Sequence, residues 1–565
     1  MNYKRQTITL LLLSACFNVA ANEPLQGYIP IDVKNTCSIS TDDFEKNWAN
    51  INLPKLGSLS PFFDKDSGIV YIFPANGPNF DSSDDCAFFE WSSQMFLWLT
   101  STVNDVTSAA SASHKKTGVN TPYVFSSEFF YRLENDVLVP QDRSLTASRK
   151  HIRVQKSVDS ADSTGQAGGN GVLFTHANTD ISNSSSLVYY EMLTNRSYGY
   201  VTDAVTKNTA LPNNFSEFVS NAAKSCQAIK YGIDNGFVNN TDISKTLYSL
   251  FCPTNKDIIE NEAATAAASS ISIPDLETAI DFLSMNMEVK TAWVDASTLK
   301  HPENYITQKG SIPIFTQVTG ENKMINSWNK NAVLALVGMH VVGSVKDHPE
   351  MIWATFEHKD NAPNSNYYYI NNMGKPTSHS DLDTQTNNRW LLSNGTHVNN
   401  VTEFGKSETD ANSGVTYIVT PDKSKPSPKP VSTPSNVNRL NPWGTEANKS
   451  NAKMNTDVIS TNISVLKQLE MFYKNKGLGD VDDPRFNYIL TGASWGAKDS
   501  FPTGSKASEI AGTPAMANTT METFQQSYTQ KDGSKTGCFS CHGIEPKDNK
   551  FDVSHIFKKI KKVQK

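Results

Sequence analysis

The runs LVGMHVV at residues 336–342 and MIWATFEH at residues 351–358 decide the fold. Short apolar runs of this kind, rich in Val, Ile and aromatic residues, predict β-strands, here at 333–342 and 351–357. Strict alternation would not place Trp353, Phe356 and His358 on one face. We therefore expect a bulge or a turn near Glu357.

Each run carries a histidine in an apolar setting, His340 in the first and His358 in the second. Glu357 and His358 are candidate catalytic residues, because a carboxylate and an imidazole at a strand end can act as acid and base or bind a metal. The alternative is a hydrogen-bonded structural histidine that fixes the following loop.

The same patterns recur along the chain. Short apolar or alternating stretches predict further strands at 123–133, 137–140, 171–174, 186–194, 287–294, 312–317, 367–370 and 416–420. Helical spacing predicts helices at 88–99, 214–250, 456–474 and 518–528, with another beginning near 272. Asn518 is the expected cap of the 518–528 helix. The fold class is therefore α+β, with a large β-rich body and a helical C-terminal segment.

Composition divides the chain and limits its partners. Residues 421–437, PDKSKPSPKPVSTPSNV, predict an extended linker or a long loop. They separate an α+β main domain at 22–420 from a helical segment at 438–565. The 565 residues are 38% hydrophobic, enough for a sizeable core, and their formal net charge is −6. Because the body has no basic block, nucleic acid is not an expected partner.

Residues 1–21 have the pattern of an export signal: a basic start, a short apolar run, and the small residues VAA at 19–21. The apolar run is too short for a membrane span, which needs about 20 residues. A second interpretation stays open, because LSAC at 13–16 is similar to a bacterial lipobox. In that case Cys16 would carry lipid and begin the mature protein. We expect a bacterial protein that is exported to the periplasm or held at the outer membrane by a lipid on Cys16.

The cysteines agree with export. Six of the seven follow Cys16, and two of those six belong to the motif described next. The other four predict two disulfides in an oxidising compartment. Sequence proximity favours the pairs Cys37–Cys86 and Cys226–Cys252, although four cysteines allow three pairings.

Cys538-Phe539-Ser540-Cys541-His542 matches C-x-x-C-H, the attachment motif of c-type haem. The two thiols of this motif bond to the haem vinyl groups, and the histidine is the proximal iron ligand. A redox disulfide would need a thioredoxin-like context and a zinc site a second ligand pair, and neither is evident. A plain disulfide within the motif is a further alternative. We expect one covalent haem c, held by Cys538 and Cys541 and ligated by His542.

The position of the motif leaves the distal ligand open. Only 23 residues follow His542, and none of them is Met. A Met ligand would raise the reduction potential relative to a second His, and an open site would let small molecules bind and react. The candidates for the distal ligand are Met516, Met521, His340, His358 and His555.

Several blocks resemble a known family. LVGMHVV and MIWATFEHKDNAP, together with FNYILTGASW at 486–495, MANTTMETF at 516–524 and the terminal CFSCHG, are similar to a bacterial family of exported cytochrome c-like proteins. The tryptophan-rich stretch 91–99 and EVKTAW at 288–293 match its earlier blocks. The resemblance covers most of 86–557 in separate pieces. It implies an exported c-haem protein with a large partner domain, and it brings no established reaction or substrate.

These features predict a periplasmic haem protein in electron transfer, with a redox partner protein. A second hypothesis is a haem-dependent oxidoreductase in which Glu357 and His358 face a small-molecule substrate. A third is a haem-bearing surface sensor or binding protein, which lipidation of Cys16 would favour. The sequence does not decide whether the protein is an enzyme.

Overall fold

We describe a computed structural model of the chain. The described residues are 25, 28–44, 83–101, 123–126, 130–134, 137–141, 152–153, 173–176, 185–195, 198–200, 202–203, 207, 231, 234–237, 286–318, 321–345, 348–381, 390–396, 406–409, 416–419, 435–475, 482–497, 509–523, 526, 537–542, 560 and 562–563.

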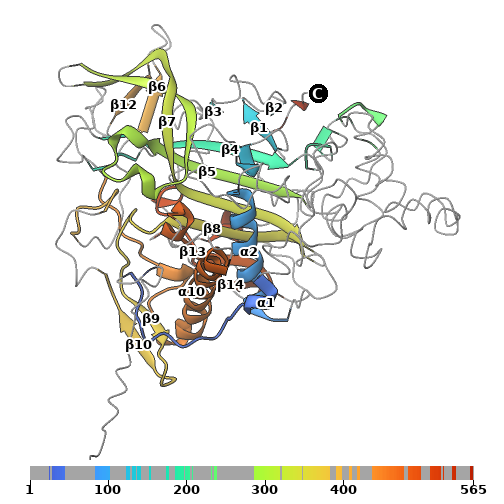
Figure 1. Ribbon diagram of the computed structural model, residues 1–565. Helices are drawn as coiled ribbons and strands as arrows, with labels where there is room; N and C mark the ends of the chain where they lie inside the picture. The colour runs from blue at the N-terminus through green and yellow to red at the C-terminus, as the bar shows by residue number, and fades with distance from the viewer. Residues whose placement is uncertain are drawn as a thin grey trace, which may run out of the picture.

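One large β-sheet organises these residues (Figure 1). Its 13 described strands are β1 (Phe130–Glu134), β2 (Val137–Pro140), β3 (Ile152–Arg153), β4 (Tyr189–Asn195), β5 (Met287–Asp295), β6 (Thr307–Val318), β7 (Glu321–Val345), β8 (His348–His358), β11 (Lys406–Thr409), β12 (Thr416–Val419), β13 (Tyr488–Gly496), β14 (Ile510–Gly512) and β15 (Lys562–Val563). The main path runs β14-β13-β8-β7-β5-β4-β1-β2-β15. Its neighbours are antiparallel except for β15, which lies parallel to β2.

The long strand β7 joins two parts of the sheet. Its C-terminal half lies between β5 and β8, with His340 in register with Lys290 on one side and Thr355 on the other. Its N-terminal half pairs with β6 and β12. The two apolar runs that decide the fold are therefore neighbouring strands at the centre of the sheet.

The central strands are buried on both faces. Every residue from 351 to 358 in β8 and every residue of β13 is buried. Strands covered on both sides read as continuous apolar runs, because neither face has to meet water. This explains why strict alternation does not describe β8.

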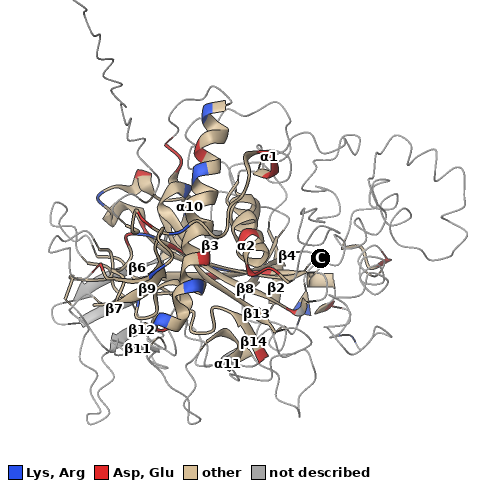
Figure 2. Ribbon diagram, turned by 90° about the horizontal axis from the view of Figure 1, so that it is seen from below, with Lys and Arg blue, Asp and Glu red and all other residues tan. Residues whose placement is uncertain are grey.

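Different layers cover the two faces, as Figure 2 shows. Helices α2 (Asp85–Leu99) and α10 (Ala452–Asn475) lie on one side of the sheet, and α11 (Cys538–His542) lies on the other. On the same side as α11, residues 513–526 contact β4, β5, β7, β8 and β13 through side chains described below.

Smaller elements complete the fold. The strands β9 (Tyr367–Ile370) and β10 (Pro376–His379) form a separate hairpin, and α1 (Thr41–Asp43) is a single turn. The 3₁₀ helices are η2 (Val124–Ser126), η5 (Ala296–Thr298), η6 (Pro302–Asn304), η7 (Pro442–Gly444), η8 (Lys449–Asn451) and η9 (Pro484–Asn487). None of the helices among the described residues is long and apolar enough to cross a membrane.

The β-rich body and several elements are confirmed. The expected helices at 88–99 and 456–474 are α2 and α10, and the expected strands at 137–140, 287–294, 351–357 and 416–420 are β2, β5, β8 and β12. The side chain of Asp84 caps α2 by accepting a hydrogen bond from the backbone N–H of Cys86 at 3.0 Å. The predicted Cys37–Cys86 disulfide is present, with 5.4 Å between the Cα atoms.

Three expectations are corrected. The C-terminal segment 438–565 is not purely helical, because it supplies β13, β14 and β15 to the main sheet. Residues 519–522 form turns and a bend where the helix was expected to begin, although Asn518 makes a cap-like contact, in which its Oδ1 accepts the N–H of Thr520 at 2.9 Å. Residues 435–437, placed in the linker by composition, pack against the body, where the backbone N–H of Val437 donates to the carbonyl of Leu392 at 2.9 Å.

The irregularity expected near Glu357 is real but lies beside it. The pairing of β13 with β8 shifts register between Leu490 and Gly492, and a turn follows His358, whose carbonyl accepts the N–H of Asn361 at 3.1 Å. Other expectations fall outside the described residues. These are the signal at 1–21 with Cys16, most of the helix at 214–250 with Cys226, the pair partner Cys252, the helix from 272, the linker residues 421–434, and His555.

Candidate haem attachment site and adjoining polar cluster

The C-x-x-C-H motif forms the short helix α11. Because an α-helix advances by roughly 100° per residue, positions 538, 541 and 542 fall on one side of it. Cys538 is partly buried against an apolar cluster in which Phe539 is only 1% exposed. The motif is therefore a helical turn that Phe539 fastens to the body.

Trp353 of β8 packs against two residues of α11. The centroid of its ring lies 4.1 Å from that of the His542 ring, with the planes inclined at 39°, and 6.1 Å from that of Phe539. Trp353, Phe539 and Met516 belong to one apolar cluster, against which Cys538 packs. The ring of His542 thus packs against the indole of Trp353.

A glycine allows α11 to approach the body. A Cβ atom at Gly537 would lie 1.9 Å from the carbonyl oxygen of Pro514, which is closer than any side chain can come. The backbone just before the motif therefore lies close to the backbone of Pro514, and a larger residue at position 537 would force the two apart.

The donor set fits a covalent haem. Helical spacing places positions 538, 541 and 542 on one side of a single turn, and the ring of His542 lies against Trp353. This arrangement suits a porphyrin, whose iron needs an axial imidazole in a mostly apolar environment. Among the described residues, no group of three or more His, Cys, Asp or Glu side chains could hold a metal ion.

The two methionine candidates are separated. Met516 lies in the cluster that contains Phe539 and Trp353, with its sulfur 3.3 Å from where a Cβ of Gly492 would be. Met521 is fully buried in a different cluster with Tyr190 and Val337. Of the two, only Met516 shares the surroundings of α11.

His340 is engaged with an acidic residue. Its Nε2 lies 2.9 and 3.0 Å from the two carboxylate oxygens of Glu522. Lys290 lies 3.4 Å from the same carboxylate. Burial works to raise the pKa of Glu522, but His340, Lys290 and the hydrogen bonds lower it to about 2. His340 therefore takes part in a salt-bridge cluster on the α11 side of the sheet.

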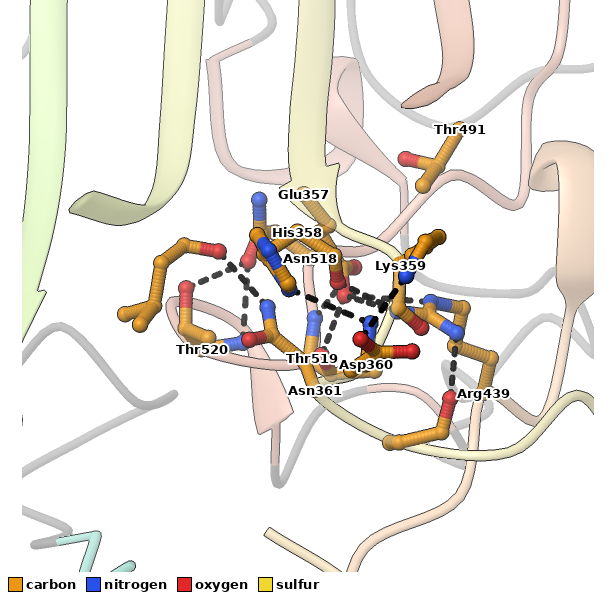
Figure 3. Close-up of polar contacts among 12 residues, drawn as sticks. Glu357, His358, Lys359, Asp360, Asn361, Arg439, Thr491, Asn518, Thr519 and Thr520 are labelled. Carbon is orange, nitrogen blue, oxygen red and sulfur yellow. Dashed lines mark hydrogen bonds and ion pairs between the residues drawn. The ribbon is translucent and has the colours of Figure 1, made fainter. Parts of the chain in front are cut away.

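Glu357 is fully buried and is bonded from two sides, as Figure 3 shows. Its Oε2 accepts from Nε of Arg439 at 3.1 Å and lies 3.0 Å from Nη2 of the same guanidinium. Its Oε1 accepts from the backbone N–H of Thr519 at 2.7 Å, and the Thr519 hydroxyl donates to Oε2. These contacts make the carboxylate a tie between β8, residue 439 and the 518–520 turn.

His358 points to the opposite side of β8 and is also fully buried. Its ring stacks on Tyr305 with 3.8 Å between centroids, and Nε2 lies 3.1 Å from the carbonyl of Asn304. The other nitrogen accepts from the N–H of Asp360 at 3.3 Å. Burial above all lowers the pKa of His358 to about 4, so the ring is neutral near pH 7. Both ring nitrogens bond within the fold, as in the structural interpretation of this histidine.

A turn at 518–522 locks onto the sheet beside these residues. Nδ2 of Asn518 donates to Oγ1 of Thr355 at 2.7 Å, and the hydroxyl of Tyr190 donates to the carbonyl of Thr520 at 2.6 Å. A Cβ atom at Gly338 would lie 2.3 Å from Oγ1 of Thr520, so a glycine is needed there. The residues that lead into the haem motif are therefore fixed to four strands.

The sequence alone does not single out Arg439 or Thr519, because nothing local marks an arginine after a proline-rich stretch or a threonine in a turn as a partner of Glu357. Trp353 stands in a run that the sequence does single out. Its contact with His542 spans almost 190 positions, so no spacing could reveal it. Comparisons with protein-family models, with curated proteins and with solved structures found no match for this chain.

Proposed function

We propose that this protein is an exported c-type haem protein that carries electrons, with one haem bound through Cys538, Cys541 and His542. The observation that carries the proposal is α11, where the C-x-x-C-H motif forms a helical turn with His542 against Trp353. When bound, the haem would supply a one-electron ferric/ferrous couple. The chain would hold it on the face of the sheet that α11 covers, next to Trp353 of β8.

The protein's own residues have defined tasks in this proposal. His542 would bind the iron, and Trp353 would keep water from the flank of the imidazole. Phe539 would hold the motif on the body. The contacts of Glu357 and His358 within the fold favour an electron carrier over the oxidoreductase hypothesis, because a catalytic pair needs atoms that can reach a substrate. Export to the periplasm, by either signal, remains part of the proposal.

The test is covalent haem on the exported protein. The full chain would be produced with its own signal in a bacterium that matures c-type cytochromes, then denatured, extracted with acidified solvent and examined by absorption spectroscopy. We expect haem to stay on the wild-type polypeptide and to be lost from the Cys538→Ala and Cys541→Ala double variant. Ser540→Ala, which keeps all three motif residues, is the matched control. A wild type without haem overturns the proposal.

Carbon monoxide separates carriers from catalysts. A ferrous spectrum that carbon monoxide does not change indicates two protein ligands and supports electron transfer. A shifted spectrum indicates an open iron and would transfer support to the oxidoreductase or sensor hypotheses.

A further inference from the structure

Trp353 contacts the C-x-x-C-H motif at His542, the residue that would bind the haem iron. On α11, His542 lies between Cys538 and Phe539 around the helix, because each residue advances by roughly 100°. Trp353 contacts both His542 and Phe539, with ring centroids 4.1 and 6.1 Å away. The indole therefore packs against both the imidazole and the phenyl ring of the motif.

The indole itself is held in place. Its Nε1 donates to the carbonyl of Glu350 at 2.9 Å, and the ring is only 6% exposed. The Glu350 carboxylate is fixed in turn, because its Oε1 lies 2.8 Å from Nδ1 of His348 and accepts from the N–H of Gly496 at 2.8 Å. A chain of hydrogen bonds thus runs from β13 and the start of β8 to the ring beside His542.

The backbone between these residues has an unusual conformation. Met351 has a φ of 66°, in the left-handed region that bulky side chains seldom adopt. It lies in β8 between Glu350 and Trp353, the two residues that the indole hydrogen bond joins. Strained positions persist where the surrounding structure fixes them, and they concentrate at functional sites.

We infer that Trp353 is a positioning residue for the axial ligand His542. The inference rests on the proposed function. Neighbours of a metal-bound histidine fix the orientation of its ring and tune the metal. Trp353 does so by ring packing, with its own orientation set by Glu350 and Met351. Replacing the indole should therefore change the haem without preventing its attachment, since both cysteines remain.

The experiment compares three variants of the full, exported protein. Trp353→Leu removes the ring, and Trp353→Phe keeps an aromatic ring but loses the hydrogen bond. Trp495→Phe is the matched control, because Trp495 is a buried tryptophan next to Ser494, which pairs with Trp353, and it packs on Phe88 at the opposite face. Circular dichroism verifies folding. The readouts are covalent haem content, the ferric electron paramagnetic resonance spectrum, whose g values follow the orientation of the axial imidazole, and the midpoint potential.

We expect Trp353→Leu to keep its haem, to shift its g values, and to change the oxidation–reduction equilibrium by about threefold to tenfold, where tenfold equals about 59 mV for one electron. Trp353→Phe should show a smaller shift, and Trp495→Phe should match the wild type. If Trp353→Leu does not fold, Trp353→Phe carries the test. Unchanged g values and potential in folded, haem-bearing Trp353 variants overturn this inference alone. A wild type without haem overturns the proposed function and this inference together.

Discussion

Arg439 and Glu357 bury opposite charges at one point of the fold, with exposures of 2% and 0%. Removing both charges from water is costly, and their attraction offsets this cost only where further hydrogen bonds complete the geometry. Arg439 has such bonds, to the carbonyl of His358 at 3.2 Å and to the carbonyl of Ala362. Burial works to lower the pKa of Arg439, but Glu357 and its other acidic surroundings raise it above its usual value. The geometry is that of a buried structural ion pair.

Replacing Glu357 should therefore reduce stability strongly. In Glu357→Gln the buried guanidinium loses its counter-charge, and we expect the free energy of unfolding in urea to fall by about 3–5 kcal/mol. Because Arg439 is then the source of the cost, Arg439→Met should cost much less in the Glu357→Gln background than in the wild type.

The double-mutant cycle also weighs the catalytic hypothesis. Additive losses, or a stable Glu357→Gln protein, would contradict a structural ion pair and would make Glu357 a better candidate for chemistry. The haem content of folded Glu357→Gln protein should equal that of the wild type, since no residue of the C-x-x-C-H motif is altered.

At the scale of elements, α10 holds the irregular segment 35–39 through a polar stripe. Ser460, Ser464 and Gln468 are spaced four apart, so they share one face of the helix. Oγ of Ser460 accepts from the N–H of Thr36 at 3.0 Å and of Cys37 at 3.1 Å, and Oγ of Ser464 accepts from the N–H of Ile39 at 2.8 Å. Side chains of a helix thus satisfy backbone groups that a neighbouring strand would otherwise bind.

Ser460→Ala should test this arrangement. Two backbone N–H groups lose their acceptor, and we expect unfolding to require about 1–3 kcal/mol less. Ser92→Ala is the matched control: Ser92 is equally buried, but its hydroxyl only donates to the carbonyl of Phe88 within α2. That variant should lose less than about 1 kcal/mol. Equal losses at both positions would argue against the stripe as a specific support.

The disulfide links the same segment to α2, and it is the feature of the fold that the sequence predicted most directly. Cys37–Cys86 closes a separation of 49 residues, which the chain-entropy model values at about 4 kcal/mol. Nearby cysteines and a helix with a capping Asp84 are local signals, and local signals suffice for α2. The N-terminal half of β7, ENKMINSWNKNA at 321–332, is polar and has no such local signal. It is a strand because its backbone groups pair with β6 and β12, and a local sequence pattern does not show that pairing.

For the whole molecule, long-range pairing explains what the sequence could not predict. The C-terminal strands β14 and β15 end the main path of the sheet, and β15 meets β2 more than 400 residues earlier in the chain. Composition after the proline-rich stretch suggested a separate helical segment, because a local pattern cannot reveal pairing at that distance. The candidate site divides in the same way. The motif at 538–542 is local and readable, whereas Trp353 and Met516 become its neighbours only through the fold.

The dependence of stability on pH also belongs to the whole molecule, because it combines buried groups in distant strands. Glu191 of β4 is 1% exposed, and its Oε2 accepts no hydrogen bond among the described residues. Burial first of all raises its pKa to about 8, since the attraction of Arg132 only partly compensates. His358 is shifted the other way, to about 4.

The signs follow from proton binding. Between pH 4.5 and 8, Glu191 binds more protons in the folded chain than in the unfolded chain, so stability falls as the pH rises. Between pH 4 and 6.5, His358 binds fewer protons in the folded chain, so stability falls as the pH drops. The two groups together favour maximum stability in mildly acidic solution.

Glu191→Gln should remove the alkaline loss, because a glutamine stays neutral throughout. Urea unfolding at pH 5, 6.5 and 8 should show a variant whose stability relative to wild type increases with pH, by at most about 1.4 kcal/mol per pH unit. His358→Gln is the complementary variant: its stability relative to wild type should increase as the pH drops from 6.5 to 4, and the difference should stay constant from 6.5 to 8. A constant difference between Glu191→Gln and wild type at all three pH values would mean that Glu191 is ionised in the folded protein. Its carboxylate would then be stabilised by more than the attraction of Arg132.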